Sequence, residues 1–176
     1  MIYRAENRKE EILGLFLVLI GVVLRIMPHP ENFTPVTAIA LFSGMVLSPA
    51  LALTIPLFVM ILSDLFLGSH PLFFLTWGSF FAVSLIGCFL RNDAGPKKIF
   101  FGTLAGSLLF FIVTNLGVFL FQNMYSKSFS GLIECYVMAV PFFRNSLAGD
   151  FFYVALFFIV FSLLKSRSNS IIHQKG

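Results

Sequence analysis

Four charged residues interrupt or closely flank the apolar segments of this chain: Arg25, Asp64, Arg144 and Asp150. An ionisable group within a membrane segment costs roughly 2.5–3.5 kcal/mol at the bilayer centre and less near the surface. Two positive and two negative side chains therefore need partners. They could pair and tie helix ends together, or they could line a pocket for a polar ligand, and the two roles are compatible. We expect Asp64 and Arg144 to lie in one outward-facing polar cluster with His29 or His70.

Three side chains of metal-binding type lie in different predicted connections: His29, His70 and Cys135. Asp64 and Glu134 are close to them in the sequence, so these five residues could form a metal site. Their spacings match no standard zinc motif. The sequence therefore leaves the metal unknown and gives His29, His70 and Cys135 as its candidate ligands.

Several catalytic motifs are absent from the sequence. It contains no GxxxxGK[ST] phosphate-binding loop, no HExxH pair and no GxSxG elbow. No apolar segment carries a string of ionisable groups at mid-depth, as a self-sufficient proton-coupled carrier usually needs. We therefore predict a binding protein and not an enzyme, with a polar cup open to the outside and energy supplied by other chains.

The composition places these residues in a membrane. Of 176 residues, 58% are hydrophobic and 11% are charged, whereas about 25% of the residues in a soluble domain are charged. The chain is predicted to be an all-α integral membrane protein with one membrane domain, residues 1–176. The net charge of +4 reflects basic residues that flank membrane segments, so we expect the lipid bilayer, and not nucleic acid, as the partner.

Basic residues set the predicted topology. Nine of the 12 Lys and Arg residues lie in three patches of three, and basic flanks of membrane spans stay in the cytoplasm. The patches are Arg4, Arg8 and Lys9; Arg91, Lys97 and Lys98; and Lys165, Arg167 and Lys175. If all three lie on one side, six spans and two cytoplasmic termini follow. The predicted spans are 11–27, 33–47, 49–67, 73–90, 99–121 and 146–164.

The second apolar stretch, residues 36–68, must contain a break. As one helix it would be about 50 Å long, against a hydrocarbon core of about 30 Å. Ser48-Pro49 is the predicted break. The predicted outer loops are residues 28–35, 68–72 and 122–145, and the last of them has a short interfacial helix at Phe129–Val140.

Small residues predict where the helices approach one another. Gly102-x-x-x-Gly106 and Ala40-x-x-x-Gly44 provide surfaces on which backbones can come close. A polar stripe recurs at helical spacing on residues 99–121 and is predicted to face the bundle interior. Its members are Thr103, Ser107, Phe110, Thr114 and Gly117.

Four blocks of sequence carry a resemblance to a known family: 25–36, 56–68, 104–118 and 131–150. They contain the motifs Pro28-His29-Pro30, Ser63-Asp64-Leu65, Thr114-Asn115 and Asn145-Ser146-Leu147. Together the blocks resemble a family of small bacterial membrane proteins that is grouped with the substrate-binding S components of energy-coupling-factor (ECF) transporters. Cobalamin-type S components are the nearest relatives that the resemblance suggests.

The resemblance implies an S-component-like bundle of six helices in the bacterial cytoplasmic (inner) membrane. It implies a pocket that opens outward between the loops and helices four to six, and import of a cobalamin-like vitamin or a metal ion. The implied partners are a small-molecule substrate, a membrane coupling subunit and ATPase subunits. No intrinsic cofactor is expected, because a bound vitamin or metal would be the cargo.

Two positions compare directly with cobalamin-type S components. Asp64 is similar to an Asp that some of them place near the end of the third helix, whereas Trp77 and Gly78 stand where their cobalt-binding cysteine would be expected. S components also often carry an Ala-x-x-x-Ala surface on helix one for docking to the coupling subunit. Here the first span has only Gly14 and Gly21, so docking is expected at Ala40/Gly44 or Gly102/Gly106.

The candidate substrate-binding residues are polar side chains of these blocks and loops. They are His29, Asn32, Asp64, His70, Asn115, Cys135, Tyr136, Arg144, Asn145 and Asp150. Two alternatives to an importer subunit remain at this stage. One is an intramembrane enzyme that uses groups such as Tyr136 and Cys135, and the other is a stand-alone small carrier.

Overall fold

The computed structural model describes residues 2–91 and 95–173 and is all-helical over these residues. The elements, in chain order, are α1 (Ile2–Ile26), α2 (Val36–Val46), α3 (Pro49–Leu67), α4 (Phe73–Leu90), α5 (Pro96–Phe121) and α6 (Phe129–His173). The prediction of an all-α protein is therefore confirmed.

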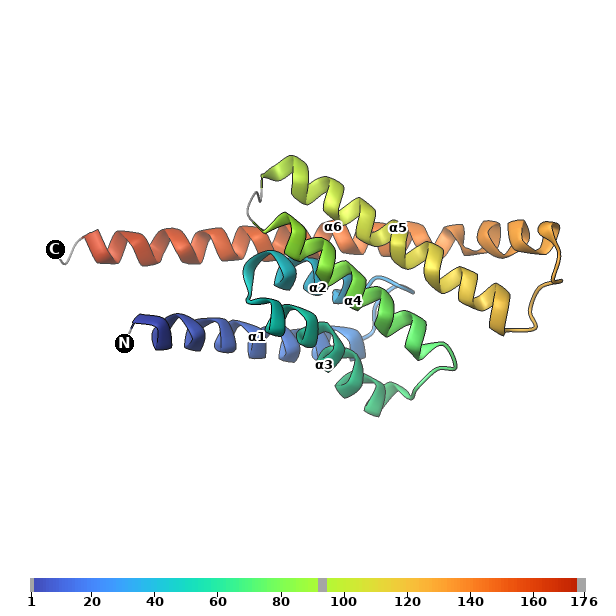
Figure 1. Cartoon of the computed structure of the whole chain (residues 1–176), viewed down its shortest axis with the longest axis horizontal. Coiled ribbons are helices and arrows are strands. Elements are labelled where there is room, and N and C mark those ends of the chain that lie inside the picture. Colours follow the sequence, from blue (N-terminus) through green and yellow to red (C-terminus); the bar gives the residue numbers. More distant parts are fainter. Residues whose placement is uncertain (1, 92–94, 174–176) are drawn as a thin grey trace.

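The chain reverses direction at every connection, so the bundle has two distinct ends (Figure 1). One end carries the starts of α1, α3 and α5 and the basic residues Lys9, Arg91, Lys97, Lys98 and Lys165; we call it the basic end. The opposite end carries the connections 27–35, 68–72 and 122–128, and we call it the loop end. Lys175 of the last patch lies outside the described residues.

Four helices in the described part of the chain are long and apolar enough to cross a membrane. The segments are Pro49–Leu67, Phe73–Leu90, Pro96–Phe121 and Phe129–Ser166. Large apolar side chains are exposed along them, including Phe89, which is 88% exposed, and Leu65, which is 75% exposed. Exposed apolar side chains along helices of this length and hydropathy are typical of surfaces that face lipid. The chain is therefore a membrane protein.

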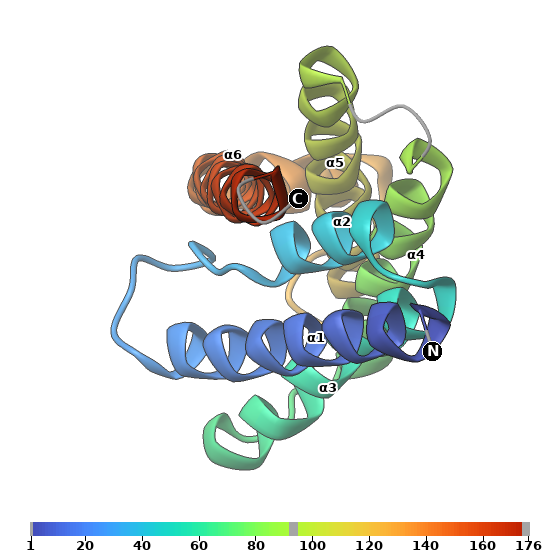
Figure 2. The same cartoon turned by 90° about the vertical axis from the view of Figure 1, so that its left-hand side faces the viewer.

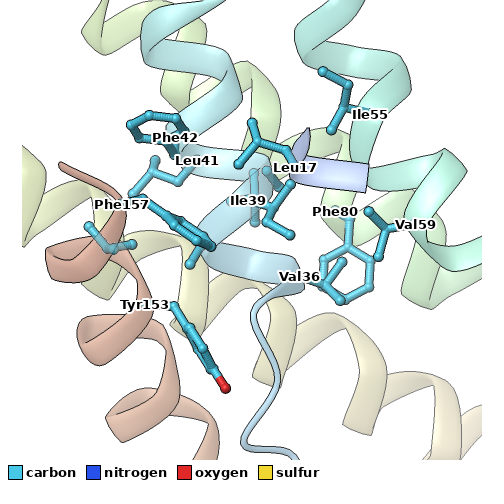
Figure 3. Packing of buried hydrophobic residues seen from close by; sticks show 14 of the residues in the cluster. Leu17, Val36, Ile39, Leu41, Phe42, Ile55, Val59, Phe80, Tyr153 and Phe157 are labelled. Atoms are coloured by element: carbon cyan, nitrogen blue, oxygen red, sulfur yellow. The ribbon is translucent and has the colours of Figure 1, made fainter. Parts of the chain in front are cut away.

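The short helix α2 is the core of the bundle. Ten of its residues, Val36–Met45, are buried, and α2 packs against each of the other five helices (Figure 2). Figure 3 shows apolar side chains from the surrounding helices, such as Leu17, Val59 and Phe157, gathered around Ile39. At 11 residues α2 is only about 16 Å long. This is shorter than a hydrocarbon core of about 30 Å, but α2 is enclosed by the other helices and not by lipid.

Glycines let α2 and α4 touch backbone to backbone. A Cβ added to Gly44 would lie 2.4 Å from the carbonyl oxygen of Ser84, and one added to Gly87 would lie 2.3 Å from that of Leu41. Gly102 and Gly106 of α5 likewise face side chains of α2 and α4. The small-residue surfaces thus build the bundle. Because Ala40, Gly44, Gly102 and Gly106 are all buried, the prediction that they form a docking surface is wrong.

The predicted break at Ser48-Pro49 is confirmed, and charged side chains cap both helix ends there. The Arg91 guanidinium donates to the carbonyl oxygen of Gly44 at 3.0 Å and to that of Leu47, at the C-terminal end of α2. The Glu10 carboxylate accepts the backbone N–H of Ser48 at 2.8 Å, at the start of α3. Each charge has the sign that the neighbouring helix dipole favours.

The last helix differs from the prediction. α6 is one helix of 45 residues, about 67 Å long, and it extends beyond α2, α3 and α4 at both ends (Figure 1). The predicted loop at 122–145 is confined to residues 122–128. Phe129–Val140 is helical, as predicted, but it is not a separate helix, because it continues into the predicted span 146–164. Pro141 lies inside α6. A proline is tolerated inside a membrane helix when neighbouring groups compensate for the freed backbone carbonyl.

Candidate functional site

A partly open cavity of about 410 Å³ lies at the loop end of the bundle. Its volume falls within the range of small-molecule sites, about 300–1,000 Å³. The end of α1, the connections 27–35 and 68–72, and α3, α4, α5 and α6 all contribute to its wall. The polar lining residues are Arg25, Asn32, Thr34, His70, Thr76, Thr114, Asn115, Gln122 and Ser146.

Aromatic rings form much of the remaining wall. Phe80 and Phe110 are stacked, with ring centroids 5.0 Å apart and planes at 22°. Phe111 and Phe143 lie 4.5 Å apart at 34°. Phe80 and Phe110 sit about two to three turns in from the loop end of their helices. The cavity therefore combines an apolar inner wall with amides and hydroxyls, a lining that suits an organic molecule with a few polar groups.

A buried ion pair holds one side of the cavity. Arg25 Nη1 lies 2.6 Å from Asp64 Oδ1 and also donates to Ser63 Oγ, and the two charged side chains are 15% and 6% exposed. Trp77 Nε1 donates to the other carboxylate oxygen of Asp64 at 3.2 Å. These contacts join α1, α3 and α4. Arg25 lines the cavity, whereas Asp64 supports it from behind.

Arg144 is not part of this cluster. It is exposed on α6, where it lines a shallow depression with Pro141, Asn145 and Ala148. The predicted grouping of Asp64 and Arg144 with a histidine is therefore wrong, because the partner of Asp64 is Arg25. The interpretation of the charges as ties between helix ends is confirmed for Arg25 and Asp64.

The candidate metal ligands do not come together. His70 lines the cavity, whereas the ring nitrogens of His29 lie 2.8 Å from the carbonyl oxygen of Pro30 and 3.2 Å from that of Arg25, at the end of α1. Cys135 is a buried free thiol whose Sγ donates to the carbonyl oxygen of Asn115 at 3.5 Å. Within residues 2–91 and 95–173, no group of three His, Cys, Asp or Glu side chains could hold a metal ion.

Two further candidates lie between helices. Tyr136 Oη donates to the carbonyl oxygen of Ile112 at 2.8 Å, so it ties α6 to α5. Asp150 is 2% exposed, accepts a hydrogen bond from Ser107 Oγ at 2.6 Å, and is also hydrogen-bonded by Thr37. It therefore lies where α2, α5 and α6 meet, within the packed core.

The connection 27–35 forms part of the cavity wall through Asn32 and Thr34. Asn32 is the one non-glycine residue in the described part of the chain with a positive φ, 60°, a conformation that asparagine adopts more readily than most residues. The carbonyl oxygen of Asn32 accepts a hydrogen bond from Ser146 Oγ at 3.3 Å, which joins this connection to α6.

Of the ten predicted site residues, the structure brings Asn32, His70 and Asn115 to the cavity wall. The others support helix contacts or lie elsewhere on the bundle. The prediction omitted Arg25, although its charge had been noted, and it omitted Thr114, although the polar stripe on residues 99–121 pointed to it. The stripe itself is confirmed: Thr103, Ser107 and Gly117 are buried, and Phe110 and Thr114 line the cavity.

Comparison with known proteins gives one match. The model of a family of unknown function, DUF6580, matches residues 5–171. No curated protein and no solved structure matches this chain.

Proposed function

We propose that this chain, which belongs to the DUF6580 family, is the membrane-embedded substrate-binding subunit of an importer for a small organic molecule. The observation that carries the proposal is the 410 Å³ cavity at the loop end, opposite the basic end. A pocket on one side of a membrane, with no motor motif in the same chain, suits a subunit that captures a solute for other chains to move.

The basic end is proposed to lie in the cytoplasm, because basic flanks of membrane spans are retained there. Six crossings and two cytoplasmic termini follow, with α2 as a short crossing enclosed by protein. The cavity then opens to the outside of the bacterial inner membrane. This orientation is the one that uptake requires.

A binding role is favoured over catalysis by the distribution of reactive side chains. Cys135, Tyr136 and Asp150, which an intramembrane enzyme would use, hydrogen-bond to neighbouring helices, and none of these described residues lines the cavity. The described part of the cavity wall consists of amides, hydroxyls, the Arg25 guanidinium, the His70 imidazole, and aromatic and aliphatic side chains. Such groups select a ligand by shape and hydrogen bonding.

The cargo is proposed to be a compact organic molecule of the vitamin class. The aromatic inner wall favours an organic ligand over a bare metal ion, and a whole corrinoid is larger than the cavity. A coupling subunit and ATPase subunits remain proposed partners on the strength of the ECF resemblance. Their docking surface would have to be the exposed apolar face, because the small-residue surfaces are buried inside the bundle.

Native mass spectrometry of the purified chain tests the proposal. A small molecule should co-purify, and its binding should fall when Asn115→Leu fills the cavity wall, whereas Asn145→Leu in the shallow depression on α6 should leave it unchanged. Uptake of the identified molecule into cells should require both this chain and an ATPase. Uptake that persists without any ATPase would instead favour a stand-alone carrier, and turnover of the molecule by the isolated chain would favour an enzyme.

A further inference from the structure

The guanidinium of Arg25 is only partly used by the protein. Its Nη1 donates to both Asp64 Oδ1 and Ser63 Oγ. A guanidinium carries five N–H donors, and within the described residues Nε and Nη2 have no partner. The Arg25 side chain is 15% exposed, and it lines the cavity. Among the described residues the one buried side-chain N or O atom without a partner is Ser84 Oγ, so Nε and Nη2 of Arg25 are accessible and can donate to a ligand in the cavity.

The orientation of this guanidinium is fixed from behind. Asp64 of α3 binds Nη1, and Trp77 of α4 holds the second oxygen of the same carboxylate at 3.2 Å. Asp64 and Trp77 are therefore positioning residues, which prevent the Arg25 side chain from turning toward solvent. A fork held in one orientation binds a planar group with little loss of side-chain entropy.

The charge balance limits the ligand to at most one negative charge. The Arg25–Asp64 pair has no net charge, and no Asp or Glu among the described residues lines the cavity. A monoanion would share the guanidinium with Asp64 and would add one negative charge to the site. A doubly charged group such as a phosphate monoester would add two, at a higher cost.

We propose that the cavity binds a small monocarboxylic acid with a planar apolar body. Its carboxylate accepts two hydrogen bonds from Nε and Nη2 of Arg25, in the bidentate geometry that a guanidinium favours. Its apolar body lies against the Phe80 and Phe110 rings on the inner wall. This inference rests on the cavity being a ligand site, as the proposed function holds, but it does not depend on transport.

Matched acid and amide pairs test the proposal directly. The full-length chain, purified in detergent, is titrated with benzoate and benzamide, nicotinate and nicotinamide, and indole-3-acetate and indole-3-acetamide at constant ionic strength. The readout is the thermal unfolding midpoint. At least one acid should raise the midpoint and its amide should not, because the amide lacks the charge and the second acceptor oxygen. Equal effects of acid and amide in every pair, or no effect of any acid, would overturn the proposal.

Variants then locate the site. Arg25→Gln should weaken acid binding by about 10- to 100-fold, as expected for charge-assisted hydrogen bonds, and Arg25→Lys should also weaken it because a lysine keeps the charge without the fork. Arg144→Gln is the matched control at an exposed arginine of the same end and should bind as the unmodified chain does. Acid binding that survives in both Arg25 variants would refute the site.

The result separates this inference from the proposed function. A neutral molecule found in the cavity by mass spectrometry, with ATP-dependent uptake, would refute the carboxylate inference and leave the importer proposal standing. Acid binding that depends on Arg25, without any ATP-dependent uptake, would support the carboxylate inference and refute the importer proposal.

Discussion

The contact between α2 and α4 offers the sharpest test of the fold, because two glycines face each other across it. Gly87→Ala places a Cβ 2.3 Å from the carbonyl oxygen of Leu41, whereas ordinary contact begins at 3.4 Å. The helices would have to separate by about 1.1 Å, which is 3.4 minus 2.3. Overpacking of this kind costs about 1–3 kcal/mol, and the upper end applies because backbone meets backbone.

A second glycine on the same helix provides the matched control. A Cβ at Gly78 would have nothing within 4 Å, so Gly78→Ala should only add the helix preference of alanine, about 1 kcal/mol. Gly87→Ala gains the same preference and should therefore lose about 2 kcal/mol net. The expected difference between the two variants is about 3 kcal/mol.

Thermal unfolding followed by circular dichroism at the helix band measures this difference. Fluorescence is less suitable, because the single tryptophan, Trp77, is the neighbour of Gly78. For a chain of this size each kcal/mol corresponds to about 2–4 °C, so the two midpoints should differ by about 6–12 °C. If Gly87→Ala melts together with Gly78→Ala, the close approach of α2 and α4 is not real and the packing argument fails.

Three further predictions follow from the buried charges and the topology. Asp64→Asn should destabilise the chain by about 3–5 kcal/mol, because it leaves the buried Arg25 unpaired. Adding Arg25→Gln should restore much of that loss in the same melting assay. A double variant as unstable as the single one would contradict the pairing. Arg91→Ala should cost about 1–3 kcal/mol, because the buried carbonyls at the end of α2 lose their charged donor, and an unchanged midpoint would show that the cap is dispensable. Reporter fusions should place residue 95 in the cytoplasm and residue 128 outside, and a periplasmic signal at residue 95 would overturn the six-span topology.

Local sequence signals located most helix boundaries. Pro49 stands in the first turn of α3, where a missing N–H costs nothing, and Gly68 follows α3 with a φ of 85°. These are properties of one or two residues and their immediate neighbours. They can be read without knowing what packs against them.

The start of α6 differs from the prediction, which has a loop at 122–145 and a separate short helix at Phe129–Val140. Pro141 directly follows that predicted helix, and in isolation a proline breaks a helix. In the bundle, α5 packs along α6 and receives the hydrogen bonds of Cys135 and Tyr136 from it. These contacts between helices outweigh the local preference, and the helix continues.

The sequence by itself determined that this is an all-helical membrane protein, where the chain breaks within residues 36–68, and which face of α5 is turned inward. Composition and periodicity are sufficient for those results, since they depend on solvent preference and on the turn of a single helix. Only the tertiary structure decided which charges meet. It paired Arg25 with Asp64, enclosed Asp150 among hydroxyls and left Arg144 on the surface, because partners separated by 39 residues, as Arg25 and Asp64 are, are chosen by how the helices pack.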